Sequence, residues 1–254
     1  MMTPAELTPI LCPESAVPTV LALEPRLAAV GQHLSATILD GPLPDVAILR
    51  RSGLEIERLL DRHHLLYGMG DREGRATVER ALFDLLSDSY EDEIDVENNL
   101  DNLRFLASLV GETANVRDER RVFLDYGCGT GLSLSLELAP GFRLIGCDAS
   151  PRMRGIASRR GMRVLSPTEL TLLPDGFFHG AIAAYVLHLA VPEIDIGSVV
   201  RTLRAGARLA ANFHKGTGVA DVERILERIG FMSLIRLPLA VPSDHGEYRL
   251  WLRL

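Results

Sequence analysis

The sequence predicts an α/β protein: a doubly wound, mostly parallel sheet of seven strands with an antiparallel last strand, preceded by a helical N-terminal region. Three observations lead to this fold class. From Arg121 onward, short apolar runs alternate with helical patterns, as a parallel sheet with crossover helices requires. A glycine-rich turn follows the first of these runs, at residues 127–131. Before residue 111, apolar residues recur at helical spacing.

The N-terminal region is expected to form a helical extension over residues 1–75, ahead of a larger domain over residues 76–254. A helix that begins after Pro25 is predicted from four apolar residues on one face: Leu27, Val30, Leu34 and Ile38. Residues 46–66 predict one or two further helices, and two amphipathic helices are predicted over Ala76–Leu86 and Leu100–Val110. We expect the extension to cover a substrate pocket or to mediate a homodimer through its helices.

The first apolar run and its turn, Phe123–Gly131 (FLDYGCGTG), predict a buried strand over Arg121–Asp125 that ends at a nucleotide-type cofactor site. A helix over Leu132–Leu138 is predicted after the turn. Glycines at alternate positions let a ligand approach the backbone closely. The carboxylate of Asp125 would repel a pyrophosphate by about 1–4 kcal/mol and attract a cationic amino-acid group by a similar amount. The turn therefore favours a ligand with a positive end.

A second buried strand is predicted over Phe142–Cys147, and it ends at Asp148, which lies 17 residues beyond Gly131. An acid at the tip of the second strand can accept hydrogen bonds from both hydroxyls of a ribose. Ser150 and Pro151 then predict the N-cap and the first residue of a new helix.

The later strands are predicted over Gly180–Leu187, Ala207–Phe213, Phe231–Pro238 and Tyr248–Leu252. Helices are predicted between them over Val199–Leu203 and Val219–Ile229. The turn-rich segment 242–246 allows the last two strands to pair antiparallel.

Three segments in this order resemble motifs of the class I S-adenosylmethionine-dependent methyltransferases: FLDYGCGTG at 123–131, LIGCDASPRM at 144–153 and LPDGFFHGAIAAYVLH at 173–188. The resemblance covers roughly Arg121 to Leu254. It implies a Rossmann-like fold that binds S-adenosylmethionine. It also implies cofactor contacts from Tyr90, Asp125, Gly127, Cys128, Gly129, Gly131, Asp148, Ala149, Met153 and Thr168.

The sequence departs from that family's pattern at two places. The family's acidic residue at the end of the third strand is missing from Leu165–Glu169, so the adenine contact would fall to Ser166, Thr168 or Glu169. His179 stands where the family often has an aspartate.

Methyl transfer depends chiefly on in-line positioning of the acceptor atom, and a general base helps when that atom carries a proton. Histidine is the usual base near neutral pH. The active site of an open α/β sheet lies beyond the carboxyl ends of its strands. Tyr185 and His188 follow the predicted fourth strand and His214 follows the fifth, so these three are the candidate catalytic residues. A structural role for either histidine remains an alternative.

Composition narrows the class of protein further. A net charge of −7 and a pI of about 5.5 argue against a general nucleic-acid binder. The three cysteines have no metal-ligand or disulfide spacing, which is typical of the cytoplasm. No apolar segment is long enough to span a bilayer, and a secretion signal is not evident. Only Lys215 among the 27 basic residues is a lysine, which suggests a GC-rich bacterial genome with a specialised metabolism.

The leading hypothesis is thus methylation of a small molecule on oxygen, nitrogen or carbon, without a metal. One alternative is an enzyme that binds the same cofactor and catalyses a cyclisation, rearrangement or elimination. Another is a non-catalytic partner subunit of the same fold. A nicotinamide-dependent oxidoreductase is disfavoured by Asp125 and by Leu132, which replaces the third glycine of the dinucleotide fingerprint.

Overall fold

The computed structural model describes residues 7–13, 26–31, 34–40, 46–51, 53–60, 63–68, 70, 72–111, 121–138, 142–214, 218–238 and 246–254. The chain divides into two compact units, Met1–Asp88 (unit 1) and Ser89–Leu254 (unit 2). The boundary predicted after residue 75 falls inside helix α3 (Arg72–Leu86), which belongs to unit 1.

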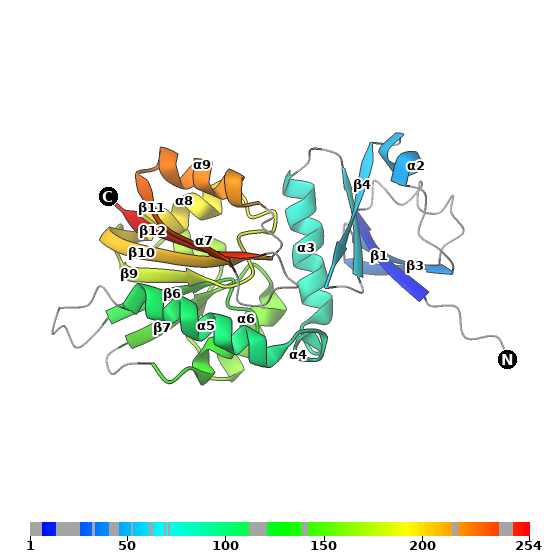
Figure 1. The fold of residues 1–254 in the computed structure, drawn as a ribbon. Coiled ribbons are helices and arrows are strands. Elements are labelled where there is room, and N and C mark those ends of the chain that lie inside the picture. Colours follow the sequence, from blue (N-terminus) through cyan, green and yellow to red (C-terminus); the bar gives the residue numbers. More distant parts are fainter. Residues whose placement is uncertain are drawn as a thin grey trace. The chain divides into compact units, whose positions relative to one another are not determined.

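Unit 1 contains a five-stranded sheet, so the prediction of a purely helical extension was wrong (Figure 1). In spatial order its strands are β2 (Arg26–Gly31), β3 (Leu34–Asp40), β1 (Leu7–Pro13), β5 (His63–Gly68) and β4 (Leu54–Leu59). Helix α2 (Val46–Arg51) packs near β4, and α3 packs on β5 and β1. The core between α3 and the sheet contains Leu11, Leu65, Tyr67, Val78 and Leu82.

The predicted helix after Pro25 fails because its apolar residues belong to two strands. Leu27 and Val30 lie in β2, whereas Leu34 and Ile38 lie in β3, which pairs antiparallel with β2. A spacing of three to four residues across two adjacent strands imitates one turn of a helix. Short apolar runs do not separate the two possibilities, and strand pairing decided between them.

Unit 2 confirms the predicted seven-stranded sheet. In spatial order its strands are β11 (Phe231–Pro238), β12 (Glu247–Arg253), β10 (Leu203–Phe213), β9 (Phe178–Ala183), β6 (Arg121–Tyr126), β7 (Phe142–Cys147) and β8 (Val164–Leu165). The last strand, β12, runs antiparallel to both of its neighbours, as predicted. The pairs between β10 and β8 are all parallel.

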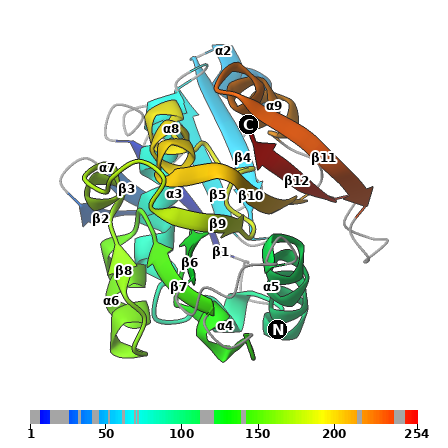
Figure 2. The same cartoon turned by 90° about the vertical axis from the view of Figure 1, so that its left-hand side faces the viewer.

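Alternate residues of the central strands enter two separate cores, which is the period-two pattern of a sheet covered on both faces. Phe123, Ile182 and Leu250 pack on the face covered by α5 (Val96–Gly111). Leu124 and Trp251 pack on the opposite face, which is covered by α8 (Glu193–Thr202) and α9 (Val219–Arg228). Figure 2 shows α5 and α8 on opposite sides of the sheet.

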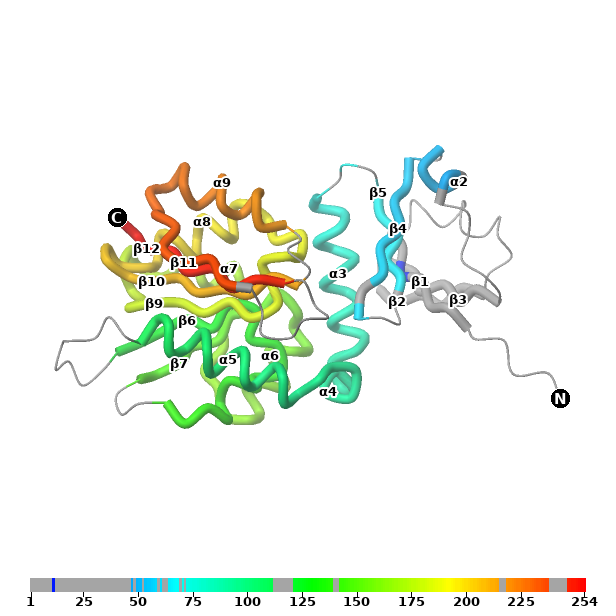
Figure 3. Tube along the Cα trace, in the orientation of Figure 1, coloured from blue at the N-terminus to red at the C-terminus, as the bar shows by residue number. Residues whose placement is uncertain are grey.

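The remaining helices of unit 2 are short. They are α4 (Tyr90–Glu93), α6 (Pro151–Arg159) and α7 (Pro167–Thr171), and the trace in Figure 3 runs from α4 directly into α5. The predicted helix over Leu132–Leu138 is only a 3₁₀ helix, Leu132–Ser135. The predicted strand Gly180–Leu187 ends early, at Ala183.

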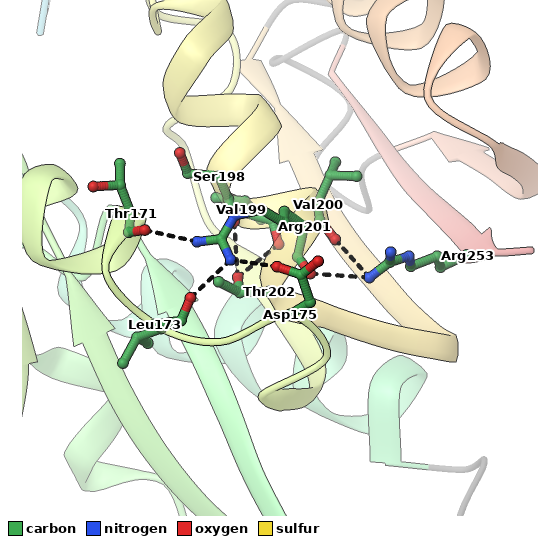
Figure 4. Close-up of polar contacts among 9 residues, drawn as sticks. All are labelled: Thr171, Leu173, Asp175, Ser198, Val199, Val200, Arg201, Thr202 and Arg253. Atoms are coloured by element: carbon green, nitrogen blue, oxygen red, sulfur yellow. Dashed lines mark hydrogen bonds and ion pairs between the residues drawn. The ribbon is translucent and has the colours of Figure 1, made fainter.

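Two arginines, Arg201 and Arg253, bind the segments that lead into β9 and β10 (Figure 4). The guanidinium of Arg201 donates to the carbonyl oxygens of Thr171 and Leu173 and to Asp175 Oδ1, at 2.9, 2.7 and 2.5 Å. Arg253 donates to the carbonyl oxygens of Val200 and Arg201 at the end of α8. These bonds add side-chain donors to carbonyl groups at and just after the ends of α7 and α8. Asp175, which belongs to the motif at residues 173–188, therefore makes a structural contact with Arg201.

The order of strands locates the site. The chain runs outward from β6 to β7 and β8, and then returns to place β9 on the other side of β6. Ligands of open α/β sheets bind at the carboxyl ends of strands where the order reverses in this way. The glycine turn follows β6 at that point.

Candidate functional site

The glycine turn is attached to the neighbouring strand by its own backbone. The amides of Gly127 and Cys128 both donate to the carbonyl oxygen of Cys147, at 2.7 and 3.2 Å. Gly127 and Gly129 have φ values of 75° and 53°, in the left-handed region that favours glycine. A Cβ at Gly127 would lie 2.6 Å from Val186 Cβ, whereas one at Gly129 would meet only Tyr90 Cε1, at 3.9 Å. Gly127 is therefore required for packing, and Gly129 leaves its backbone open.

A pocket that is open to solvent lies beside this turn. Four segments of unit 2 form its walls: α4, α5, the end of β6 with the turn that follows it, and the start of the segment after β9. The lining residues are Tyr90, Asn99, Leu103, Asp125, Gly127, Cys128, Gly129, Thr130, Leu132, Ser133 and Ala184. Five of the ten residues predicted to bind cofactor are thus brought together here.

Asp125 is the acidic group of this pocket, and its side chain is almost completely buried. Its Oδ2 accepts a hydrogen bond from the hydroxyl of Ser133 at 2.5 Å. Burial raises the pKa of Asp125 to about 6, with a smaller contribution from the charge of Asp148, while the Ser133 bond acts in the opposite direction. A cationic group in the pocket would compensate for this buried negative charge.

Asp148 follows β7, and its carboxylate contacts the turn directly. Oδ2 accepts from the amide of Gly129 at 2.9 Å, and Oδ1 accepts from the amide of Ser150 at 2.8 Å. Each carboxylate oxygen can accept more than one hydrogen bond, so the side chain retains capacity for ribose hydroxyls. The bonds also show that Asp148 stabilises the turn itself.

Tyr90 and Cys128 line the same pocket as neutral groups. Burial, reinforced by the charges of Asp148 and Glu91, raises the pKa of Tyr90 to about 12. Burial also raises the pKa of the Cys128 thiol well above its ordinary value. The phenol and the thiol therefore keep their protons at neutral pH, and Cys128 serves the turn through its backbone.

The other predicted cofactor residues lie outside the pocket lining. Gly131 begins the 3₁₀ helix and packs on Ala157, and Met153 is buried in α6. Ala149 is exposed beside Asp148, and Thr168 is exposed on α7.

Two of the three alternatives for the adenine contact, Ser166 and Glu169, bond to each other. Ser166 caps α7 and forms a reciprocal capping box with Glu169, whose Oε2 accepts from the Ser166 amide at 2.7 Å. His179, which stands where the methyltransferase family often has an aspartate, has a structural role. Its Nδ1 accepts a hydrogen bond from the Val122 amide at 3.2 Å and so connects β9 to β6.

The three candidate catalytic residues lie beyond the carboxyl ends of β9 and β10, as predicted. Tyr185 has a φ of 53°, a rare value for a residue with a side chain. The rings of His188 and His214 lie 6.1 Å apart between centroids. The structure thus brings the two histidines together.

A polar network that sequence analysis missed surrounds Tyr185. Asn102 of α5 donates through Nδ2 to the Tyr185 hydroxyl at 2.9 Å and accepts from the Tyr248 hydroxyl at 2.5 Å. Asn212 accepts from the Tyr185 amide at 2.6 Å. Asn102 and Asn212 are both buried. The sequence offered one signal for this network, Asn102 in the apolar face of the predicted helix Leu100–Val110. A side-chain amide that is buried there requires hydrogen-bond partners.

Sequence analysis also missed Glu91. Its Oε1 accepts from the Thr130 hydroxyl at 2.6 Å and from Arg160 at 2.5 Å. Nothing in its sequence context distinguishes it from the neighbouring acids of residues 88–97.

Among the residues that the structure describes, no helix is both long and apolar enough to cross a membrane. Within the same described part of the chain, no group of three or more His, Cys, Asp or Glu side chains could hold a metal ion.

Comparison with known proteins agrees with this geometry. Residues 124–211 match the family described as "Methyltransferase domain". The structure of Burkholderia thailandensis 1,6-didemethyltoxoflavin-N1-methyltransferase, with bound 1,6-didemethyltoxoflavin and S-adenosylhomocysteine, is similar over 79% of this chain and 94% of its own, with 16% identity and a TM-score of 0.56.

A SAM-dependent methyltransferase from Aquifex aeolicus is similar over 63% of this chain and 100% of its own, with 18% identity and a TM-score of 0.47. No curated protein matches the chain in sequence.

Proposed function

We propose that the chain, whose residues 124–211 match a methyltransferase domain, transfers the methyl group of S-adenosylmethionine to a small-molecule acceptor. The observation that carries the proposal is the pocket at the glycine turn. Its lining combines an open backbone at Gly129 with a buried carboxylate at Asp125, and a second carboxylate, that of Asp148, bonds to the turn beside it. These groups match a ligand with a cationic amino-acid end and a ribose.

The residues of the chain then have separate tasks. Asp125 would hold the cationic amino group, and Asp148 would accept from the ribose hydroxyls. When bound, S-adenosylmethionine supplies a methyl group that its sulfonium already activates. Tyr185, His188 and His214 lie beyond the ends of β9 and β10, where they would orient the acceptor and remove its proton.

A small-molecule acceptor is supported by the similar Burkholderia enzyme, whose structure holds 1,6-didemethyltoxoflavin beside S-adenosylhomocysteine. The net charge of −7 at pH 7 argues against a nucleic-acid substrate and so supports the same class. The proposal also includes action in the cytoplasm on a specialised metabolite. It further includes a homodimer that forms through unit 1.

Calorimetric titration of the full chain tests the cofactor. S-adenosylmethionine and S-adenosylhomocysteine are each expected to bind at one site and to compete, whereas NADH gives no saturable heat. Failure of both sulfur compounds to bind contradicts the proposal, and saturable NADH binding favours an oxidoreductase.

Turnover with a panel of phenols, nitrogen heterocycles and amines tests the reaction. Methylated product and S-adenosylhomocysteine are expected in equal amounts. Product that forms without S-adenosylhomocysteine would exclude methyl transfer and indicate a cyclisation, rearrangement or elimination.

A further inference from the structure

Helix α4 forms one wall of the cofactor pocket, although it contains only four residues. Its first residue, Tyr90, lines the pocket and lies over Gly129. None of its residues is fully buried, and a helix of one turn has little stability of its own. The position of this wall must therefore depend on side-chain contacts with the rest of unit 2.

Glu91 makes two such contacts with a single oxygen atom. Its Oε1 accepts from Thr130 in the glycine turn and from Arg160 at the end of α6. We define Glu91, Thr130 and Arg160 as the clasp. Because one acceptor atom serves both donors, withdrawal of Glu91 breaks both contacts together.

The two contacts differ in strength. Arg160 and Glu91 are 41% and 32% exposed, so water and salt weaken their ion pair. Thr130 is only 3% exposed, and its hydroxyl donates to a charged acceptor, which makes a stronger hydrogen bond. Removal of the carboxylate would leave this buried hydroxyl without its acceptor. The pKa of Glu91 is lowered, chiefly by the Arg160 bond, which keeps the carboxylate ionised at neutral pH.

The geometry points to Glu91 as a positioning residue: the clasp holds Tyr90 against the glycine turn and sets the rate at which the adenosyl cofactor leaves the pocket. This inference rests on the proposed function, because it assumes that the pocket binds the cofactor. Opening of the clasp releases α4 and removes the Tyr90 wall, while Asp125 and Asp148 stay in place on the sheet.

The test measures dissociation of S-adenosylhomocysteine from the immobilised full chain by surface plasmon resonance. Glu91→Ala is expected to raise the dissociation rate constant about tenfold, and Arg160→Gln is expected to raise it less. Asp92→Ala is the matched control, since Asp92 is an exposed acid of the same helix, and it should match the parent. Equal rate constants for Glu91→Ala and Asp92→Ala would overturn the inference.

A double variant separates positioning from a general loss of stability. Once Tyr90→Ala has removed the wall, adding Glu91→Ala should change the dissociation rate constant by less than about twofold. A full tenfold effect in that background would show that Glu91 acts independently of Tyr90. If Glu91→Ala does not fold, Arg160→Gln, alone and combined with Tyr90→Ala, decides the question. If the parent itself fails to bind S-adenosylhomocysteine, the proposed function fails instead.

Discussion

The backbone amide of Tyr185 donates a 2.6 Å hydrogen bond to Oδ1 of Asn212, which joins the segment after β9 to the end of β10. Tyr185 occupies a left-handed conformation with a φ of 53°, and Asn212 is completely buried. Such conformations cost free energy and persist where their surroundings enforce them, often at functional sites. The Asn212 side chain is the group that enforces this one.

Substitution Asn212→Ala is therefore expected to lower the free energy of unfolding by about 1–3 kcal/mol, because it removes the buried acceptor of the Tyr185 amide. Urea denaturation followed by circular dichroism measures the change. Asn99→Ala serves as the control, since the Asn99 side chain donates to an exposed carbonyl oxygen, that of Asp95. An equal loss of stability in both variants would contradict the special role of Asn212.

Replacing Gly127 or Gly129 with alanine should distinguish the glycine that packing requires from the glycine that ligand binding requires. Gly127→Ala should lower the free energy of unfolding by the cost of a left-handed alanine, about 1–2 kcal/mol, plus about 1–3 kcal/mol for overlap with Val186. Gly129→Ala should incur only the first of these costs, but weaken binding of S-adenosylhomocysteine. Thermal unfolding and calorimetry measure the two effects. The opposite ranking of the stability losses would refute the assignment.

Asp148→Ala is expected to weaken binding of S-adenosylhomocysteine by about 1–3 kcal/mol, since ribose hydroxyls would lose their acceptor. The variant should also be less stable, because Gly129 and Ser150 lose the same acceptor. Asp148→Asn retains one acceptor oxygen and should be intermediate in both measurements. If Asp148→Ala and Gly129→Ala bind like the parent, the turn is only structural.

Binding should depend on pH through Asp125, because burial raises the pKa of its carboxyl from the ordinary 3.8 to about 6. A cationic ligand favours the ionised carboxylate, so affinity for S-adenosylhomocysteine should rise with pH up to about 6, and binding near about pH 5 should release a proton. Calorimetry in two buffers of different ionisation enthalpy measures that proton. Asp125→Asn should abolish the release.

The same pKa shift also predicts the effect on stability. The folded state of the unliganded protein binds this proton more tightly than the unfolded state does. The contribution of Asp125 to stability is therefore most favourable below about pH 3.8, and it decreases as the pH rises to about 6. Comparison of the parent with Asp125→Asn by urea denaturation across this range measures it. A parent advantage that grows with rising pH would contradict the sign.

Much of unit 2 was predictable because its determinants are local in the sequence. The strands Phe142–Cys147 and Phe231–Pro238 are apolar runs bounded by turn residues, and Ser150 with Pro151 marks a helix start. The glycine turn was predictable for the same reason, since left-handed backbone and close approach require glycine. In unit 1, by contrast, apolar residues of β2 and β3 imitated a helix.

Local patterns along the chain predict the seven-stranded sheet, the turn after β6 and the two acids at the tips of neighbouring strands, Asp125 and Asp148. The groups around this site are set by tertiary packing. Tyr90 and Glu91 reach the turn from α4, and Asn102 and Asn212 reach Tyr185 from α5 and β10. The reason is that hydrogen bonds and burial join residues up to 146 positions apart, as in the contact of Tyr248 with Asn102. Residue spacing along the chain carries no record of such contacts.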